Sequence, residues 1–193
     1  MRVTLLSAPW YQEPPAPALV EACEVLGDRT WRDAAVGFYA ERAARVRRGR
    51  SAPKGMQLEL NKVVAQRLEG AGWAGADGRF AKDQTWIRVT FRHQMSLGSD
   101  ILDAARLCAR EGYLQAAILA AESGFLRVIS PNDYGALVSF EKLRIAVAEL
   151  QGVLDIPLFL GALSPKSVVP PDIVAELRKE RPRDKTVPAD NTQ

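Results

Sequence analysis

Arg79-Phe-Ala-Lys-Asp-Gln-Thr-Trp-Ile-Arg-Val-Thr-Phe91 is the most informative stretch of this sequence. Its alternating apolar and polar residues predict two short strands joined by a tight turn near Asp83. Successive side chains of a strand point to opposite faces of a sheet, so Arg88 and Thr90 are expected to share a face. The stretch therefore predicts a strand pair that carries two arginines, Arg79 and Arg88, on neighbouring strands.

The flanking sequence predicts helices on both sides of a sheet. Apolar residues at helical spacing indicate amphipathic helices, and short apolar runs indicate strands buried on both faces. Helices are expected at residues 18–26, 30–49, 56–71, 99–110 and 139–150, and strands at residues 2–6, 79–81, 86–91, 116–121 and 157–163. Ser99 or Asp100 is expected to cap the fourth helix, and a loop around Pro131 to precede the fifth. This alternation favours an α/β fold with a central mixed sheet flanked by helices.

Length and composition fit one globular domain with short extensions. The chain has 193 residues, 47% of them hydrophobic and 25% charged, with a formal net charge of +3. Residues 1–55 are expected to join a core over residues 56–164, and the Pro-rich residues 165–193 to form a partly disordered tail. We find no signal peptide and no apolar run long enough to span a membrane, so a cytoplasmic location is expected.

Histidine and cysteine are too scarce for several kinds of catalytic site. The one histidine, His93, has no nucleophile motif to serve, and the spacing of Cys23 and Cys108 does not suggest a zinc site. Both cysteines are expected to be buried, reduced thiols. The sequence therefore predicts no resident cofactor.

Positive charge gathers in one short segment. Five arginines and one lysine follow Glu41 with no acid among them: Arg42, Arg45, Arg47, Arg48, Arg50 and Lys54. Such a run is often a solvated helix end, but basic stretches also supply the sequence-independent attraction to nucleic-acid phosphates. We expect Arg45, Arg47, Arg48, Arg50 and Lys54 to contact nucleic acid.

Residues 54–165 carry several marks in the order found in one known family. Residues 79–83 (R-F-A-K-D) and 87–91 (I-R-V-T-F) match that family's run D-F-x-K-D followed by I-E-V-Q-F in their apolar positions. The other marks are Leu60-Asn61 in a predicted helix, a helix beginning near Asp100, an apolar strand at residues 116–121 and Ile156-Pro-Leu-Phe-Leu-Gly161. Over more than half its length, the sequence resembles the BglII/BstYI group of type II restriction endonucleases, which belong to the PD-(D/E)XK nuclease superfamily.

The resemblance implies a restriction-endonuclease-like fold, duplex DNA as the ligand and a homodimer that grips it. At the family's metal site, however, the residues differ. The strand aspartate corresponds to Arg79, and the next acid and the Gln or Glu after it correspond to Arg88 and Thr90. The acid beside the helical asparagine corresponds to Lys62, and Asn61 alone matches. Magnesium needs oxygen ligands, which arginine lacks, so the resemblance implies a degenerate site without a metal.

Other interpretations of these residues stay open. One is a magnesium site rebuilt from relocated acids: Glu59, Asp77 and Asp83. It requires Asp77 to share a strand face with Arg79. In another, Arg79 and Arg88 are surface residues or are paired internally with an acid such as Asp77. In the interpretation that we favour, both arginines and Asn61 contact phosphate groups.

Three functions are consistent with these patterns. We expect a catalytically inactive, restriction-endonuclease-like DNA-binding protein of a defence or mobile-element system. The first alternative is a pseudo-nuclease subunit that docks a protein partner in a defence complex, with residues 168–181 as the docking segment. The second is an active Mg²⁺-dependent endonuclease, whose relocated acids would hold the metal that activates water. Enzymatic activity therefore stays open, and the two arginines argue against it.

Overall fold

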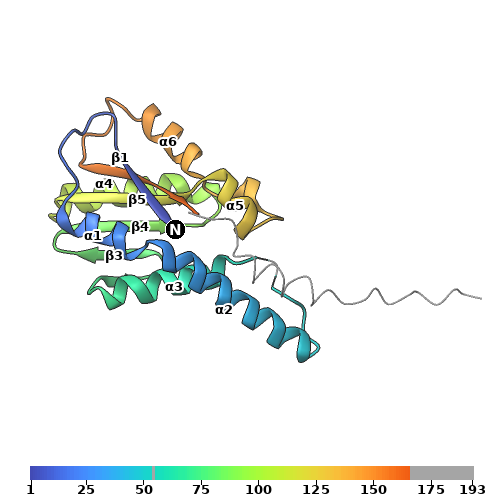
Figure 1. Ribbon diagram of the computed structural model, residues 1–193. Helices are drawn as coiled ribbons and strands as arrows, with labels where there is room; N and C mark the ends of the chain where they lie inside the picture. Colours follow the sequence, from blue (N-terminus) through green and yellow to red (C-terminus); the bar gives the residue numbers. More distant parts are fainter. Residues whose placement is uncertain (54, 166–193) are drawn as a thin grey trace, which may run out of the picture.

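The computed structural model describes residues 1–53 and 55–165, which form a six-stranded sheet with helices on both faces (Figure 1). The strand order is β1-β6-β5-β4-β3-β2. The strands are β1 (Arg2–Ser7), β2 (Ala74–Ala76), β3 (Arg79–Lys82), β4 (Thr85–Thr90), β5 (Gln115–Ala121) and β6 (Leu158–Ser164). Strands β4, β5 and β6 run parallel, whereas β1, β2 and β3 pair antiparallel with their neighbours. The expected mixed sheet is confirmed.

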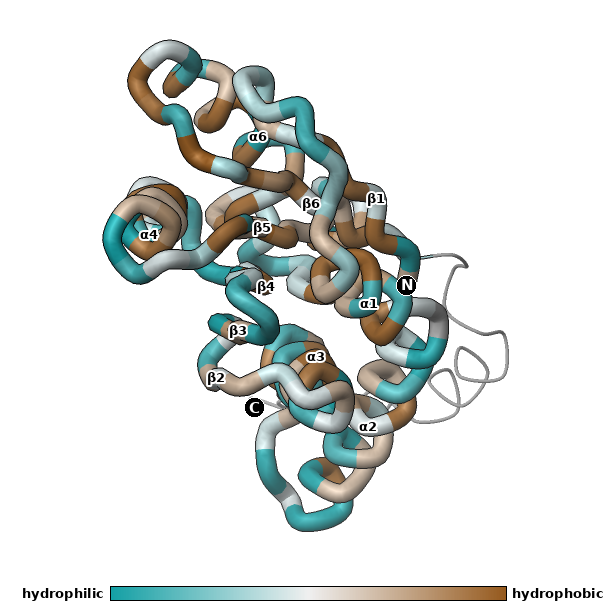
Figure 2. The backbone as a smooth tube through the Cα atoms, turned by 90° about the vertical axis from the view of Figure 1, so that its left-hand side faces the viewer, coloured by the Kyte–Doolittle hydropathy of each residue, from teal (hydrophilic) through white to brown (hydrophobic). Residues whose placement is uncertain are grey.

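The helices divide between the two faces of the sheet. They are α1 (Pro17–Val25), α2 (Asp28–Arg47), α3 (Gln57–Gly70), α4 (Leu97–Arg110), α5 (Ser123–Ile129) and α6 (Phe140–Glu149). Helices α1, α2, α3 and α5 share one apolar cluster with the sheet, and α4 and α6 share the other. Figure 2 shows α4 and α6 on one side of the strands and α1, α2 and α3 on the opposite side.

Strand β4 shows how the two clusters are separated. Ile87 and Val89 are buried in the cluster of α1, α2 and α3, whereas Trp86 is buried in the cluster of α4 and α6. Because side chains alternate along a strand, Arg88 lies on the same face as Trp86. An arginine therefore points from the middle of a buried strand toward α4.

Three local predictions were wrong. Helix α2 begins at Asp28, before Thr30, and α4 begins at Leu97, so Asp100 lies inside the first turn and does not cap it. Part of the loop expected before the last helix is helix α5. Glu141 of α6 accepts hydrogen bonds from the Ser123 backbone N–H and hydroxyl at the start of α5. This stabilising partner is distant in sequence, which explains why a local pattern missed the helix.

The two cysteines are free and partly buried, rather than fully buried as expected. Burial, with a contribution from Glu24, raises the pKa of the Cys23 thiol to about 12. Burial alone raises the pKa of Cys108 to about 11. Both thiols therefore stay protonated at neutral pH, the form that reacts poorly.

Two sequence predictions fall outside the described residues: the contact at Lys54 and the tail with its docking segment at residues 168–181. Within residues 1–53 and 55–165, no helix is long and apolar enough to cross a bilayer.

Candidate functional site

Two tight turns fix the strand pair predicted around residues 79–91. Asp77 and Gly78 connect β2 to β3, and Asp83 and Gln84 connect β3 to β4, all with positive φ angles between 46° and 77°. Two consecutive residues of this kind form the turn that matches the twist of a hairpin. A Cβ atom at Gly78 would collide with the Val89 carbonyl oxygen, so glycine is required there.

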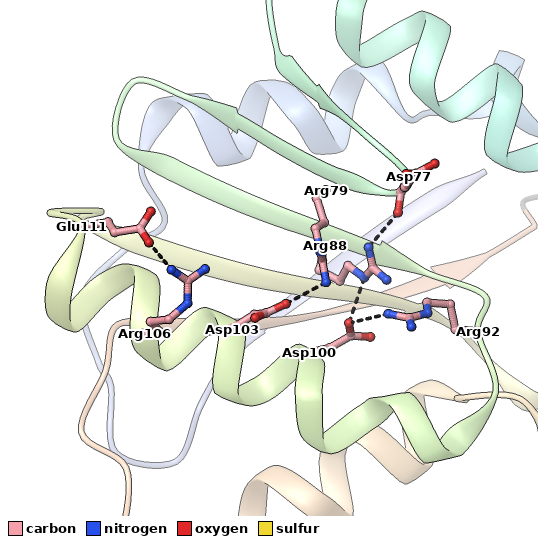
Figure 3. Close-up of polar contacts among 8 residues, drawn as sticks. All are labelled: Asp77, Arg79, Arg88, Arg92, Asp100, Asp103, Arg106 and Glu111. Carbon is pink, nitrogen blue, oxygen red and sulfur yellow. Dashed lines mark hydrogen bonds and ion pairs between the residues drawn. The ribbon is translucent and has the colours of Figure 1, made fainter.

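The turns bring together the arginines that the sequence placed on neighbouring strands. In the register of β3 and β4, Arg79 lies directly opposite Arg88, and both side chains reach toward α4 (Figure 3). Asp77 lies in the turn and not on strand β3, so it does not share the strand face with Arg79 that the relocated-acid interpretation requires. The physical reason is the Asp-Gly pair itself, which favours a two-residue hairpin turn over an extended strand.

A cleft of about 620 Å³ opens where α3 meets this hairpin. Nine of the described residues line it: Leu58, Asn61, Lys62 and Ala65 of α3, Asp77 and Gly78 of the turn, Arg79, Arg88, and Arg92 just after β4. Among these residues Asp77 carries the only carboxylate, against four cationic side chains. The cleft wall is therefore predominantly basic.

Arg88 has a buried acidic partner. Its Nε lies 3.0 Å from Asp100 Oδ1 of α4, and the two side chains are 2% and 0% exposed. Arg88 Nη1 also donates a hydrogen bond of 2.7 Å to the backbone carbonyl of Asp77. Burial lowers the pKa of Arg88, and the charge of Asp100 opposes that shift. We therefore assign Arg88 to the fold, because a phosphate would have to displace these partners.

The other cations of the cleft are solvent-exposed and loosely paired. Arg92 Nη1 lies 3.3 Å from the same Asp100 oxygen that Arg88 approaches. Arg79 Nη2 lies 2.8 Å from Asp103 Oδ2, with the two side chains 51% and 29% exposed. Lys62 lies 3.3 Å from Glu59 on its own helix. Three cationic side chains thus remain accessible from solvent.

The internal partners of the arginines differ from the one considered from sequence. Arg79 and Arg88 pair with Asp103 and Asp100, whereas Asp77 contributes its backbone carbonyl. Asp100, Asp103 and Arg92 were missed as site residues. For the two acids, the sequence signal was their i, i+3 spacing on an amphipathic helix, which places both on the same helix face.

Only some of the other site residues predicted from sequence lie in or near the cleft. Asn61 and Lys62 line the cleft with the arginines, and Thr90 is buried nearby, where its hydroxyl accepts a 3.4 Å hydrogen bond from the Arg92 backbone N–H. The relocated acids are not brought together. Asp77 and Asp83 occupy turns at opposite ends of β3, and Glu59 packs against Gly37 of α2.

The side chains of the cleft do not fit the divalent cation that the fold family implies. Magnesium prefers several carboxylate or carbonyl oxygens, and arginines stand at two of the positions where the resemblance places acids. Throughout the part of the chain that the structure describes, no three His, Cys, Asp or Glu side chains are grouped to hold a metal.

The basic segment, defined here as residues 42–50, forms the end of α2 and the residues just after it. Arg45 pairs with Glu41 at 2.7 Å, while Arg47, Arg48 and Arg50 are exposed. The pKa of Glu41 is lowered first by its hydrogen bond from Arg45, and further by the charges of Arg48 and Lys62. Lys62 also lines the cleft, so the charges of the basic segment and of one cleft residue both act on Glu41, across the packed helices α2 and α3. Figure 1 shows α2 and α3 side by side.

Comparison with known proteins defines the fold class. No protein-family model matches this chain, and a search of curated proteins finds no match. The crystal structure of restriction endonuclease BglII complexed with a DNA 16-mer matches with a TM-score of 0.52 and 14% identity, covering 84% of this chain and 76% of that one. The structure of free BglII matches with a TM-score of 0.48 and 15% identity, covering 86% and 81%. This chain has a restriction-endonuclease-like α/β fold.

Proposed function

We propose that this protein binds duplex DNA through the cleft and the basic segment, without cleaving it through a bound metal. The observation that carries the proposal is the set of exposed cations around one cleft: Lys62, Arg79 and Arg92. Guanidinium groups donate paired N–H bonds to phosphate oxygens, and lysine adds a point charge. The basic segment extends the same charge along α2.

The fold supports this class of ligand. The solved structure with a TM-score of 0.52 is an enzyme complexed with DNA. The chemistry differs here, because metal-dependent hydrolysis needs carboxylates to hold the ion, and Arg79 and Arg88 offer none. The protein therefore contacts DNA without hydrolysing it at a metal site.

The first experiment measures binding and cleavage together. The full chain is incubated with mixed-sequence duplex and single-stranded DNA, with Mg²⁺, with Mn²⁺ and with EDTA. We expect a gel shift on duplex DNA in all three conditions and no cleavage products. Metal-dependent products that disappear in Asp77→Ala would instead establish an active endonuclease with relocated acids.

The basic segment is tested through salt dependence. Each lost phosphate contact lowers the slope of log affinity against log salt by about 0.9 for duplex DNA. We expect Arg48→Gln to lower the slope by about that amount. Arg144→Gln is the matched control, because Arg144 is an exposed arginine of α6 on the opposite face of the sheet. Equal slopes for the two variants would remove the basic segment from the interface.

One observation favours a second candidate function, the docking of a protein partner. Every cation of the cleft has an acidic neighbour in Glu59, Asp100 or Asp103, which lowers the net positive potential. A basic cleft whose cations are partly neutralised suits a protein surface as well as a phosphate backbone. Weak, salt-insensitive DNA binding together with a stable complex with another protein would favour this candidate.

The expected homodimer, the defence or mobile-element setting and the cytoplasmic location stay predictions. Light scattering of the free protein and of its DNA complex measures the first of these directly.

A further inference from the structure

Two acids of α4 face the arginines of the strand pair. Asp100 and Asp103 are three residues apart, so their side chains leave the helix on one face. Asp100 approaches Arg88 and Arg92, and Asp103 approaches Arg79 (Figure 3). Helix α4 thus presents carboxylates to Arg79 and Arg92, the exposed guanidinium groups that a phosphate would contact.

The Arg79–Asp103 pair can open at small cost. Both side chains are partly exposed, at 51% and 29%, so water can replace each partner. Exposed ion pairs of this kind contribute little net stability, because their charges are screened and two long side chains lose freedom in forming them. The buried Arg88–Asp100 pair lacks this freedom.

Arg79 also lies at the boundary between two hollows. It lines the cleft with Lys62 and Arg92, and it lines a smaller hollow of about 230 Å³ with Asp103. Asp103 belongs to the smaller hollow and is not among the residues that line the cleft. Turning about its flexible side-chain bonds, the Arg79 guanidinium can face either Asp103 or the cleft.

We propose that Asp103 is an intramolecular competitor of nucleic-acid phosphate for Arg79. In the free protein Asp103 holds the guanidinium over the smaller hollow. When DNA occupies the cleft, Arg79 leaves Asp103 and contacts a phosphate beside Lys62 and Arg92. This inference rests on the proposed DNA-binding function and adds a residue that limits affinity at the same site.

A double-mutant cycle on the full chain tests the competition. Binding of a fluorescein-labelled, mixed-sequence duplex is measured by anisotropy for wild type, Asp103→Asn, Arg79→Gln and the double variant. We expect Asp103→Asn to tighten binding about two- to fivefold, the range set by an exposed ion pair. Arg79→Gln weakens binding about tenfold, and adding Asp103→Asn to it gives no further tightening.

The control separates competition from a general change of charge. Glu111→Gln removes the same charge from the end of α4, where Glu111 pairs with exposed Arg106. Tightening by Asp103→Asn beyond that of Glu111→Gln, lost when Arg79 is absent, supports the inference. Equal effects of the two acid variants, or tightening that persists with Arg79→Gln, would overturn it while leaving DNA binding intact.

If neither wild type nor any variant binds the duplex, both the inference and the proposed function are overturned. If Asp103→Asn binds the duplex and wild type shows no measurable binding, the competition by Asp103 is supported most strongly. Thermal unfolding of each variant accompanies the cycle, and we expect Asp103→Asn and wild type to unfold at closely similar temperatures.

Discussion

The pairs Arg88–Asp100 and Arg79–Asp103 have the same chemistry and differ in burial. The arginines face each other on β3 and β4, and the acids lie three residues apart on α4. The first pair is almost fully buried, whereas the second is open to water. Removing one partner of a buried pair leaves an uncompensated charge, and removing one partner of an exposed pair leaves a solvated one.

Because of this difference in burial, one arginine of the site stabilises the fold and the other can bind a ligand. Arg88 stands at one of the positions where the resemblance places a metal-binding acid, yet its contacts serve the packing of α4 on the sheet. Arg79 stands at another and remains available to a ligand.

Placing acids at the positions where the resemblance expects them should unfold the protein. In Arg79→Asp with Arg88→Glu and Thr90→Gln, the new carboxylate at position 88 would lie beside buried Asp100 and share only Arg92 with it. We expect a loss of at least about 5 kcal/mol in the free energy of unfolding, measured by urea denaturation. Adding Asp100→Asn to the triple variant should recover part of that loss, and a stable triple variant would contradict the buried pairing.

Removing the buried acid alone should be the next most damaging change. Asp100→Asn leaves the buried Arg88 guanidinium without a counter-charge, and we expect a loss of about 3–5 kcal/mol in the free energy of unfolding. Asp103→Asn is the matched control, with an expected change below about 1 kcal/mol. Similar values for both variants in urea titrations would show that burial does not distinguish the pairs.

Replacing both members of the buried pair should be milder than replacing one. Apolar groups of similar volume can substitute for a buried ion pair, because the desolvation of both charges disappears with them. We expect Arg88→Met with Asp100→Leu to be more stable than Arg88→Met by about 1–3 kcal/mol. Additive losses in the double variant would argue that the two side chains act independently.

Arg92 provides the intermediate case, an exposed arginine on the buried acid. Asp100 keeps Arg88 when Arg92 is removed, so we expect Arg92→Gln to change unfolding by less than about 1 kcal/mol. Its cost should appear in DNA binding, as a salt slope lower by about 0.9 for one phosphate contact. A large loss of stability with unchanged DNA binding would show that Arg92, like Arg88, serves the fold and not the ligand.

Much of the fold followed from local sequence patterns. Apolar runs predicted β5 and β6, helical periodicity predicted α3 and α6, and the turn at Asp83 and Gln84 was placed correctly. These features depend on neighbours in sequence. Helix α5 was missed because its stabilising carboxylate comes from Glu141 on another helix.

The candidate site was predictable in position and less so in its contacts. The resemblance brought Asn61, Lys62, Arg79 and Arg88 into one place, and the structure lines one cleft with all four. The relocated-acid interpretation needed Asp77 on the strand face of Arg79, and an Asp-Gly turn places it off the strand. No pattern around residue 88 indicates whether its charge is solvated, since burial depends on how α4 packs across the sheet.

The sequence alone determined that arginines stand where the resemblance expects metal-binding acids, because residue identity fixes which groups can coordinate a cation. It also determined the alternation that places Arg88 and Thr90 on one strand face. The contacts of each arginine, by contrast, depend on how the helices pack on the sheet. Helix α4 places Asp100 in the buried interior and Asp103 at the solvent-exposed edge of the site. The free energy needed to separate a charge pair depends on how well water screens the charges, so the two pairs differ.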